Sequence, residues 1–159
     1  MDHRPPAIFV GGAPGLDFLN SIATPLDTPV DWLDDGEGYV NGLEQAHLVP
    51  GDVLRDVRAR ARPGELDEVA DQARSLREWF RVFVGRHKGR PLTAEALAEL
   101  APLSRLLERD ETFSRITLSP AGQRRFRLEV LRRWRNLNAL CSPSQRRWLS
   151  WSARRTFRT

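Results

Sequence analysis

An uninterrupted amphipathic pattern over residues 64–88 constrains the fold of this chain more than any other feature. One helical face carries residues at the i, i+3, i+4, i+7 spacing, namely Leu66, Val69, Ala73, Leu76, Phe80, Phe83, Val84 and His87. Gly89 follows at the position where a left-handed residue commonly ends a helix. The pattern predicts one long helix whose apolar stripe faces the core.

Weaker patterns predict further helices on either side. Apolar residues have helical spacing over residues 37–48, and a short helix is expected over residues 52–60. Thr93 suits the N-cap of a helix over residues 94–109, because its hydroxyl can accept a hydrogen bond from a free N–H of the first turn. Pro102 should kink or split that helix, since proline lacks the N–H that the helix interior needs.

Two stretches predict β-structure. Residues 7–12 form an apolar run that ends in two glycines, as a strand that enters a turn does. Residues 116–119 and 124–130 flank a turn and predict a β-hairpin, whose alternation gives a basic face and a buried apolar face made of Phe126, Leu128 and Val130. The sequence therefore predicts a single α+β domain in which a small antiparallel sheet packs on three to five helices.

Length and composition narrow the class of protein. The 159 residues suit one domain, and 40% apolar with 29% charged residues is a globular mixture. No apolar run approaches the roughly 20 residues of a membrane-spanning helix, so no membrane partner is expected. Cys141 is the single cysteine, which excludes a disulfide framework and an ordinary intrachain zinc finger and favours a cytoplasmic setting. We expect no bound metal and no cofactor.

The charges are distributed unevenly along the chain. Residues 1–120 carry 14 basic and 20 acidic side chains, whereas residues 121–159 carry 11 arginines and Glu129 as the single acid. Such a basic end favours nucleic acid as a partner. The candidate nucleic-acid-binding residues are Arg124, Arg125, Arg127, Arg132, Arg133 and Arg135. The alternative is a solvated strand face followed by a basic linker, with Phe126 and Trp134 in the core.

Polar residues inside apolar segments give the candidate ligand site. Asp17 and Asn20 lie three apart in an apolar segment, and Arg77 flanks the stripe of the long helix. Buried polar groups must be paired, so Asp17 and Arg77 either form a structural bridge or rim a ligand pocket together with Asn20. The glycines of residues 11–15 lack phosphate-loop spacing and favour a tight turn. No catalytic constellation emerges, and no catalytic residue is assigned.

The order of several motifs resembles a known family. The landmarks are LDFLNS at residues 16–21, VDWLDDGE at residues 30–37, GLEQAHLV at residues 42–49, the long helix and RRWR at residues 132–135. Over residues 7–139 this succession resembles the ABATE domain, the N-terminal half of the bacterial CGNR zinc-finger family of stress-response transcription regulators. The resemblance implies a regulatory role and, through the family's C-terminal finger, DNA binding. The Cys-Gly-Asn-Arg motif of that finger is not found in this chain.

The last residues differ in character from the rest. Residues 1–139 are expected to form the ABATE-like domain and residues 140–159 a basic tail, which has no acids and no consistent apolar period. We hypothesise a shift of reading frame near Leu140. Codons can be chosen for the tail that, when read in another frame, encode a segment resembling the family's next helix. Sequencing of the locus tests this hypothesis.

Two functions from different classes are consistent with these residues. The first is a non-enzymatic regulatory or sensor domain that binds a small ligand or a protein partner and makes weak, non-specific nucleic-acid contact through its arginine-rich end. The alternative is a small-molecule-binding protein or enzyme whose pocket lies between the strand at residues 7–12 and the helix at residues 64–88. The oligomeric state is not indicated.

Overall fold

The predicted long helix is the central element of the structure, a computed structural model that describes residues 4–9, 14–24, 27–89, 91–118, 126–135 and 137–141. This helix, α4 (Glu65–His87), has acids in its first turn and basic residues in its last, and Gly89 follows it with a positive φ of 74°. The stripe residues Val69, Ala73, Leu76, Phe80 and Phe83 are buried. The prediction for residues 64–88 is confirmed.

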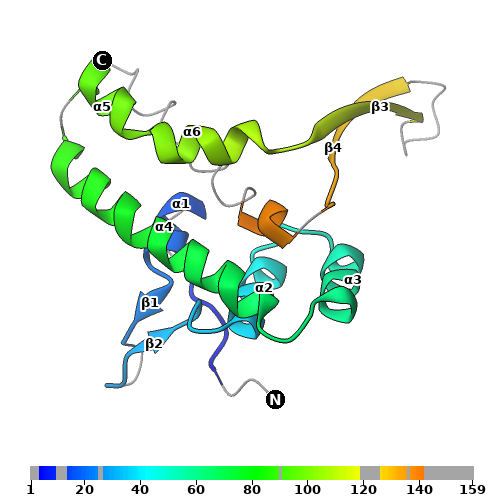
Figure 1. Cartoon of the computed structure of the whole chain (residues 1–159), viewed down its shortest axis with the longest axis horizontal. Helices are drawn as coiled ribbons and strands as arrows, with labels where there is room; N and C mark the ends of the chain where they lie inside the picture. Colours follow the sequence, from blue (N-terminus) through cyan, green and yellow to red (C-terminus); the bar gives the residue numbers. More distant parts are fainter. Residues whose placement is uncertain are drawn as a thin grey trace.

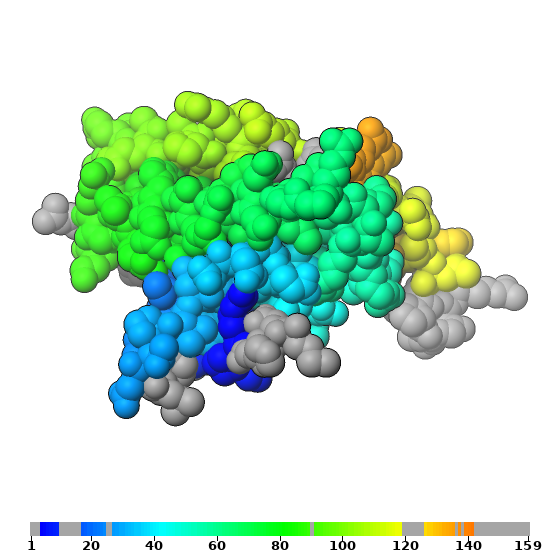
Figure 2. Space-filling view, turned by 60° about the horizontal axis from the view of Figure 1, so that its bottom comes forward, coloured from blue at the N-terminus to red at the C-terminus, as the bar shows by residue number. Residues whose placement is uncertain are grey.

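Two layers of elements flank α4 (Figure 1). On one side lie β1 (Ile22–Ala23), β2 (Val30–Asp31), α2 (Gly36–Gln45) and α3 (Gly51–Arg60), and α1 (Pro14–Leu19) contacts α4. On the other side lie α5 (Ala94–Glu99) and α6 (Ala101–Glu108), and Figure 2 shows them packed along α4. A 3-10 turn, η1 (Leu137–Cys141), lies between the layers and brings Leu140 and Cys141 into the core.

The helices expected around α4 form close to the predicted bounds. Thr93 caps α5, where its hydroxyl accepts a hydrogen bond from the N–H of Ala96 at 3.3 Å. The helix predicted over residues 94–109 is split into α5 and α6 at Leu100, and Pro102 lies in the first turn of α6, where the missing N–H has no cost. None of the helices in the described part of the chain is long and apolar enough to cross a bilayer.

The N-terminal strand is not formed as predicted. Residues 7–9 have no strand structure, and residues 10–12 lie outside the described residues. The N–H of Ala7 is bonded to the side chain of Gln45 instead of a neighbouring strand, so this segment joins no ladder. The described sheets have two strands each: β1 pairs with β2, and β3 (Thr112–Leu118) pairs with β4 (Phe126–Arg132). The chain is thus a small α+β domain, as predicted.

The hairpin of β3 and β4 is present, but its predicted buried face is wrong. The antiparallel register places Ile116 opposite Leu128 and Leu118 opposite Phe126. The hairpin extends beyond the end of α6 and away from the other helices (Figure 1), so the described part of the body does not cover it. Its apolar side chains are exposed; they are Ile116, Leu118, Phe126, Leu128 and Val130.

Candidate functional site

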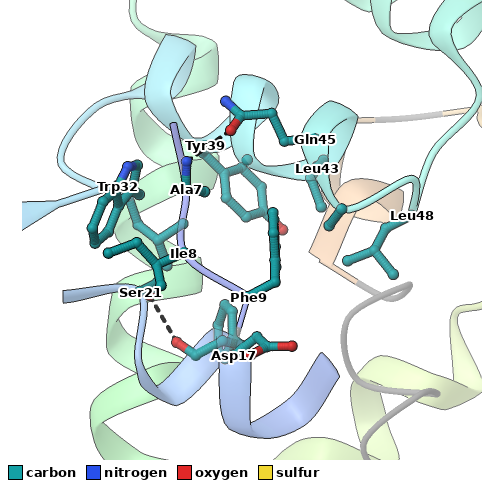
Figure 3. A pocket seen from close by; sticks show the side chains of 14 residues that line it. Ala7, Ile8, Phe9, Asp17, Ser21, Trp32, Tyr39, Leu43, Gln45 and Leu48 are labelled. Carbon is teal, nitrogen blue, oxygen red and sulfur yellow. Dashed lines mark hydrogen bonds between the residues drawn. The ribbon is translucent and has the colours of Figure 1, made fainter. Parts of the chain in front are cut away.

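A cavity of about 250 Å³ lies between the N-terminal segment, α1, the loop that follows β2 and α2 (Figure 3). Most of its surface is apolar, and four aromatic side chains contribute to it, namely Phe9, Phe18, Trp32 and Tyr39. Polar groups stand at its opposite ends, where Figure 3 shows Asp17 on one side and Gln45 on the other. Such a lining suits a small, largely apolar molecule with a polar end.

Residues 4–9, here called the N-terminal strap, close one side of the cavity. Three contacts fix the strap: Arg4 forms an ion pair with Asp35, the indole N–H of Trp32 donates to the carbonyl of Pro5 at 2.8 Å, and the N–H of Ala7 donates to Oε1 of Gln45 at 2.7 Å. Side chains of α2 and its entry therefore replace the missing strand ladder as partners of this segment.

The entry to α2 is shaped to receive Arg4. Asp35 caps α2 by accepting a hydrogen bond from the N–H of Gly38 at 2.7 Å. A Cβ at Gly38 would lie 2.9 Å from the carbonyl oxygen of Trp32 and would also meet the guanidinium of Arg4, so this position favours glycine. Burial raises the pKa of Asp35, but the bonds from Arg4 and from the N–H of Gly38 outweigh it, and its pKa ends below the ordinary value. Asp35 is thus ionised and holds the strap at neutral pH.

Arg77 does not line the cavity but holds residues that do, through Ser21. Its side chain is only 3% exposed, and its two Nη atoms lie 2.7 Å from the two carboxylate oxygens of Asp31. Nη1 also donates to the hydroxyl of Ser21 at 2.9 Å, and Nε donates to Glu78. Ser21 lines the cavity and donates in turn to the carbonyl of Phe18 at 2.7 Å. Arg77 therefore ties β1, β2 and the end of α1 to α4.

The structure separates the three predicted ligand-binding residues. Asp17 lines the cavity, Asn20 is exposed and is not among the lining residues, and Arg77 reaches the cavity only through Ser21. The bridge expected between Asp17 and Arg77 is made by Asp31 instead.

The cavity also differs in place from the one expected. It lies between the strap and α2, and α4 contributes none of its lining residues. Sequence reasoning missed Trp32, Tyr39, Gly42 and Gln45 as lining residues. Gly42 was the detectable signal, since glycine in the middle of a helix is unfavourable and suggests that space is needed there.

Three of the predicted nucleic-acid-binding arginines are bound to carboxylates of the hairpin region. Arg127 lies 3.1 Å from Glu129, and Arg135 lies 3.2 Å from Glu111. Arg132 lies 2.6 Å from Asp110, whose side chain is only 1% exposed, and its guanidinium stands 5.2 Å from the centre of the Trp134 ring. The buried Arg132–Asp110 pair stabilises the base of the hairpin, and all three pairs reduce the charge available for phosphates.

Arg133 differs from those three. Its guanidinium lies 5.0 Å from the ring centre of Phe113, and Arg115 lies 5.7 Å from the same centre. Neither arginine forms an ion pair with any described residue, and both are exposed. Arg124 and Arg125 lie outside the described residues.

A second hollow of about 440 Å³ lies between α4, α6 and η1, where Trp79, Leu106 and Cys141 contribute to its lining. Burial raises the pKa of the Cys141 thiol to about 11, so the thiol stays protonated at neutral pH and is a poor nucleophile. No group of three or more His, Cys, Asp or Glu side chains among the described residues is arranged to hold a metal ion.

Comparison with known proteins gives a family for this fold. A model of the ABATE family, described as "putative stress-induced transcription regulator", matches residues 12–159. The match covers nearly the whole chain and includes the basic tail. No curated protein and no solved structure matches the chain. With its motifs, its α+β fold and this match in agreement, the chain belongs to the ABATE family.

Proposed function

We propose that this domain is the ligand-sensing part of a transcription regulator, and that the cavity beneath the N-terminal strap binds one small, mainly apolar molecule. The volume of the cavity indicates a small ligand. It lies between the roughly 150 Å³ that suffices for benzene and the roughly 300 Å³ at which pockets for drug-sized ligands begin. At about 250 Å³, the cavity suits a ligand of one or two rings, or a short acyl chain. A polar group on the ligand would face Asp17 or Gln45.

Tyr39 is the observation that carries the sensing role. Its ring lines the cavity, yet the residue is only 2% exposed, and its hydroxyl donates to the carbonyl of Leu140 at 2.9 Å. Leu140 belongs to η1, the last described element of the chain, and is fully buried. A ligand that shifts the ring of Tyr39 therefore acts directly on the segment that leads into the C-terminal tail.

The hydroxyl groups of the cavity support binding more than catalysis. Ser21 accepts a hydrogen bond from Arg77 and donates to the carbonyl of Phe18, and Tyr39 donates to the carbonyl of Leu140. A hydroxyl whose proton is directed at a carbonyl is not activated for attack, since activation requires an adjacent base. The enzyme alternative therefore has less support than the binding role.

Indole, phenol and hexanoate are suitable probes of the cavity by nuclear magnetic resonance of the ¹⁵N-labelled protein. We expect saturable shifts of the Trp32 indole N–H and the Gly42 amide with at least one probe, because both residues line the cavity. A Cβ at Gly42 would meet no atom within 4 Å, so Gly42→Leu should place its side chain in the cavity and abolish the shifts.

Gly85→Leu is the matched control. Gly85 is also helical, its Cβ would also meet no atom within 4 Å, but it lies on the exposed face of α4. This variant should bind the probes as the parent does. The proposal fails if no probe gives saturable shifts, or if Gly42→Leu and Gly85→Leu bind equally well.

A second function, weak contact with nucleic acid, is favoured by the free charge of Arg115 and Arg133. Non-specific binding at physiological salt has dissociation constants of roughly 10⁻⁴–10⁻⁶ M, and each neutralised phosphate adds about −0.9 to the log–log salt slope. Changing Arg115 and Arg133 together to Gln should therefore make the slope on duplex DNA about 2 units less steep.

Arg132→Gln is the contrasting variant. Because Arg132 is bound to the buried carboxylate of Asp110, its loss should lower the melting temperature and leave the salt slope unchanged. Fluorescence anisotropy over a salt series measures the slope. An unaltered slope in the Arg115 and Arg133 double variant would contradict this contact.

A further inference from the structure

The β3–β4 hairpin presents an apolar face to solvent. Five large side chains share this face and are 66–73% exposed: Ile116, Leu118, Phe126, Leu128 and Val130. We call it the apolar hairpin face. A two-stranded hairpin without further strands or a helix is only marginally stable, so this hairpin gains from pairing with further strands. In Figure 2 the hairpin protrudes from one end of the body.

The sequence of β4 identifies what can pair with this hairpin. Residues 126–130 read Phe-Arg-Leu-Glu-Val, so apolar residues and opposite charges are arranged symmetrically about Leu128. If a second copy of β4 runs antiparallel about a two-fold axis at Leu128, Phe126 faces Val130 and Arg127 faces Glu129 of the other copy. Opposite charges and apolar pairs in directly opposed positions stabilise antiparallel strands.

Other registers lose this complementarity. A two-fold axis at residue 127 places Arg127 against itself, and an axis at residue 129 places Glu129 against itself. Like charges in directly opposed positions destabilise a strand pair. An axis between two residues is excluded, because successive side chains of a strand point to opposite faces and such an axis would oppose residues of different faces. Within β3, Arg115 is the single charged residue, so that edge offers no opposite charge to a second copy.

We propose that the domain forms a homodimer through antiparallel pairing of β4 with β4 of a second copy, centred on Leu128. The product is a four-stranded sheet with the order β3–β4–β4–β3 and one continuous apolar face. In one copy Arg127 lies 3.1 Å from Glu129 along the same strand, so the two charges are already on a common face and at the right positions. The pairing is independent of the ligand cavity.

The test uses charge reversal at the two positions. Arg127→Glu should set two acids against each other in the dimer, and Glu129→Arg should set two arginines against each other. Each single variant should raise the dimer dissociation constant by roughly tenfold or more, measured by sedimentation equilibrium. An equimolar mixture of the two variants should form a heterodimer, because each acid then faces an arginine of the other copy.

Recovery on mixing separates a contact between copies from a defect within one chain. The double variant that exchanges the two charges should also dimerise as the parent does. Arg105→Gln removes one exposed positive charge from α6, outside the hairpin, and should leave the dissociation constant unchanged. A parent protein that is monomeric across the concentration series, single variants that dimerise normally, or a mixture that stays monomeric would each overturn the proposal.

Discussion

Arg77 shows how one buried charge can set the position of several elements. The guanidinium reaches Asp31, Ser21 and Glu78, which lie in or beside three different elements. The sequence indicates that Arg77 needs a buried partner and points to Asp17, whereas the structure supplies Asp31. Asp31 reaches Arg77 because β1 pairs with β2. This ladder has only two residues in each strand, which is too short to be recognised from the sequence.

The Asp31–Arg77 pair should make stability depend on pH. Burial raises the pKa of Asp31, but the bonds from Arg77 and the N–H of Leu33 outweigh it, so its pKa in the folded protein lies below the ordinary value. A lowered folded-state pKa stabilises the fold above the unfolded-state pKa of about 3.9, and the contribution is lost as the pH falls through the folded-state pKa. Asp31→Asn should cost about 3 kcal/mol at pH 7, since it leaves the buried guanidinium of Arg77 with only the exposed carboxylate of Glu78 as an ionic partner.

Urea unfolding of the parent and of Asp31→Asn over a pH series measures this difference. The gap in unfolding free energy should be constant near neutral pH and should narrow below about pH 4. Asp56→Asn is a suitable control, because the ion pair of Asp56 with Arg60 is exposed and worth little. A gap that does not change with pH would show that Asp31 acts through something other than its charge.

At the scale of elements, the signals that proved reliable were local. The stripe of α4, the cap at Thr93 and the break at Pro102 each depend on residues within one or two turns, and each is confirmed. Residues 7–9 of the predicted strand do not form one, because a strand needs a partner and the strap is bonded to the side chains of Trp32 and Gln45 instead. An apolar run alone cannot distinguish these two outcomes.

The stripe of α4 gives a prediction about stability. Phe80 is only 8% exposed and packs against Trp79 and Phe83, so Phe80→Ala should cost about 3–5 kcal/mol through lost burial and a cavity. Val82 is 52% exposed on the same helix, and Val82→Ala should cost less than about 0.5 kcal/mol. Denaturant midpoints compare the two. Equal midpoints would mean that the stripe does not carry the core.

Two glycines in helix interiors, Gly42 of α2 and Gly85 of α4, give a second prediction for the elements. Gly42→Ala and Gly85→Ala should each stabilise the protein by about 0.5–1 kcal/mol, because a Cβ at either position meets no atom and alanine favours the helix. Thermal melting measures both. If Gly42→Ala destabilises the protein while Gly85→Ala does not, glycine at position 42 is needed for the packing of α2 and not to leave space for a ligand.

For the whole molecule, the α+β class could be predicted because composition, length and the sum of local patterns fix it. The position of the cavity could not, since it arises where the strap, α1 and α2 meet and no single segment encodes it. The arginine cluster illustrates the same limit. Its charge was evident, but only the fold shows that Arg127, Arg132 and Arg135 are bound by Glu129, Asp110 and Glu111.

The separation of the hairpin from the core has a consequence for hydrogen exchange. The amides of β3 and β4 are bonded within a ladder that is exposed along its apolar face, whereas those of α4 are packed in the centre of the domain. In the monomer, opening the hairpin exposes little new apolar surface, so its amides should exchange through a local event far below the free energy of global unfolding. The domain should therefore show two exchange regimes, and only the slower one reports its stability.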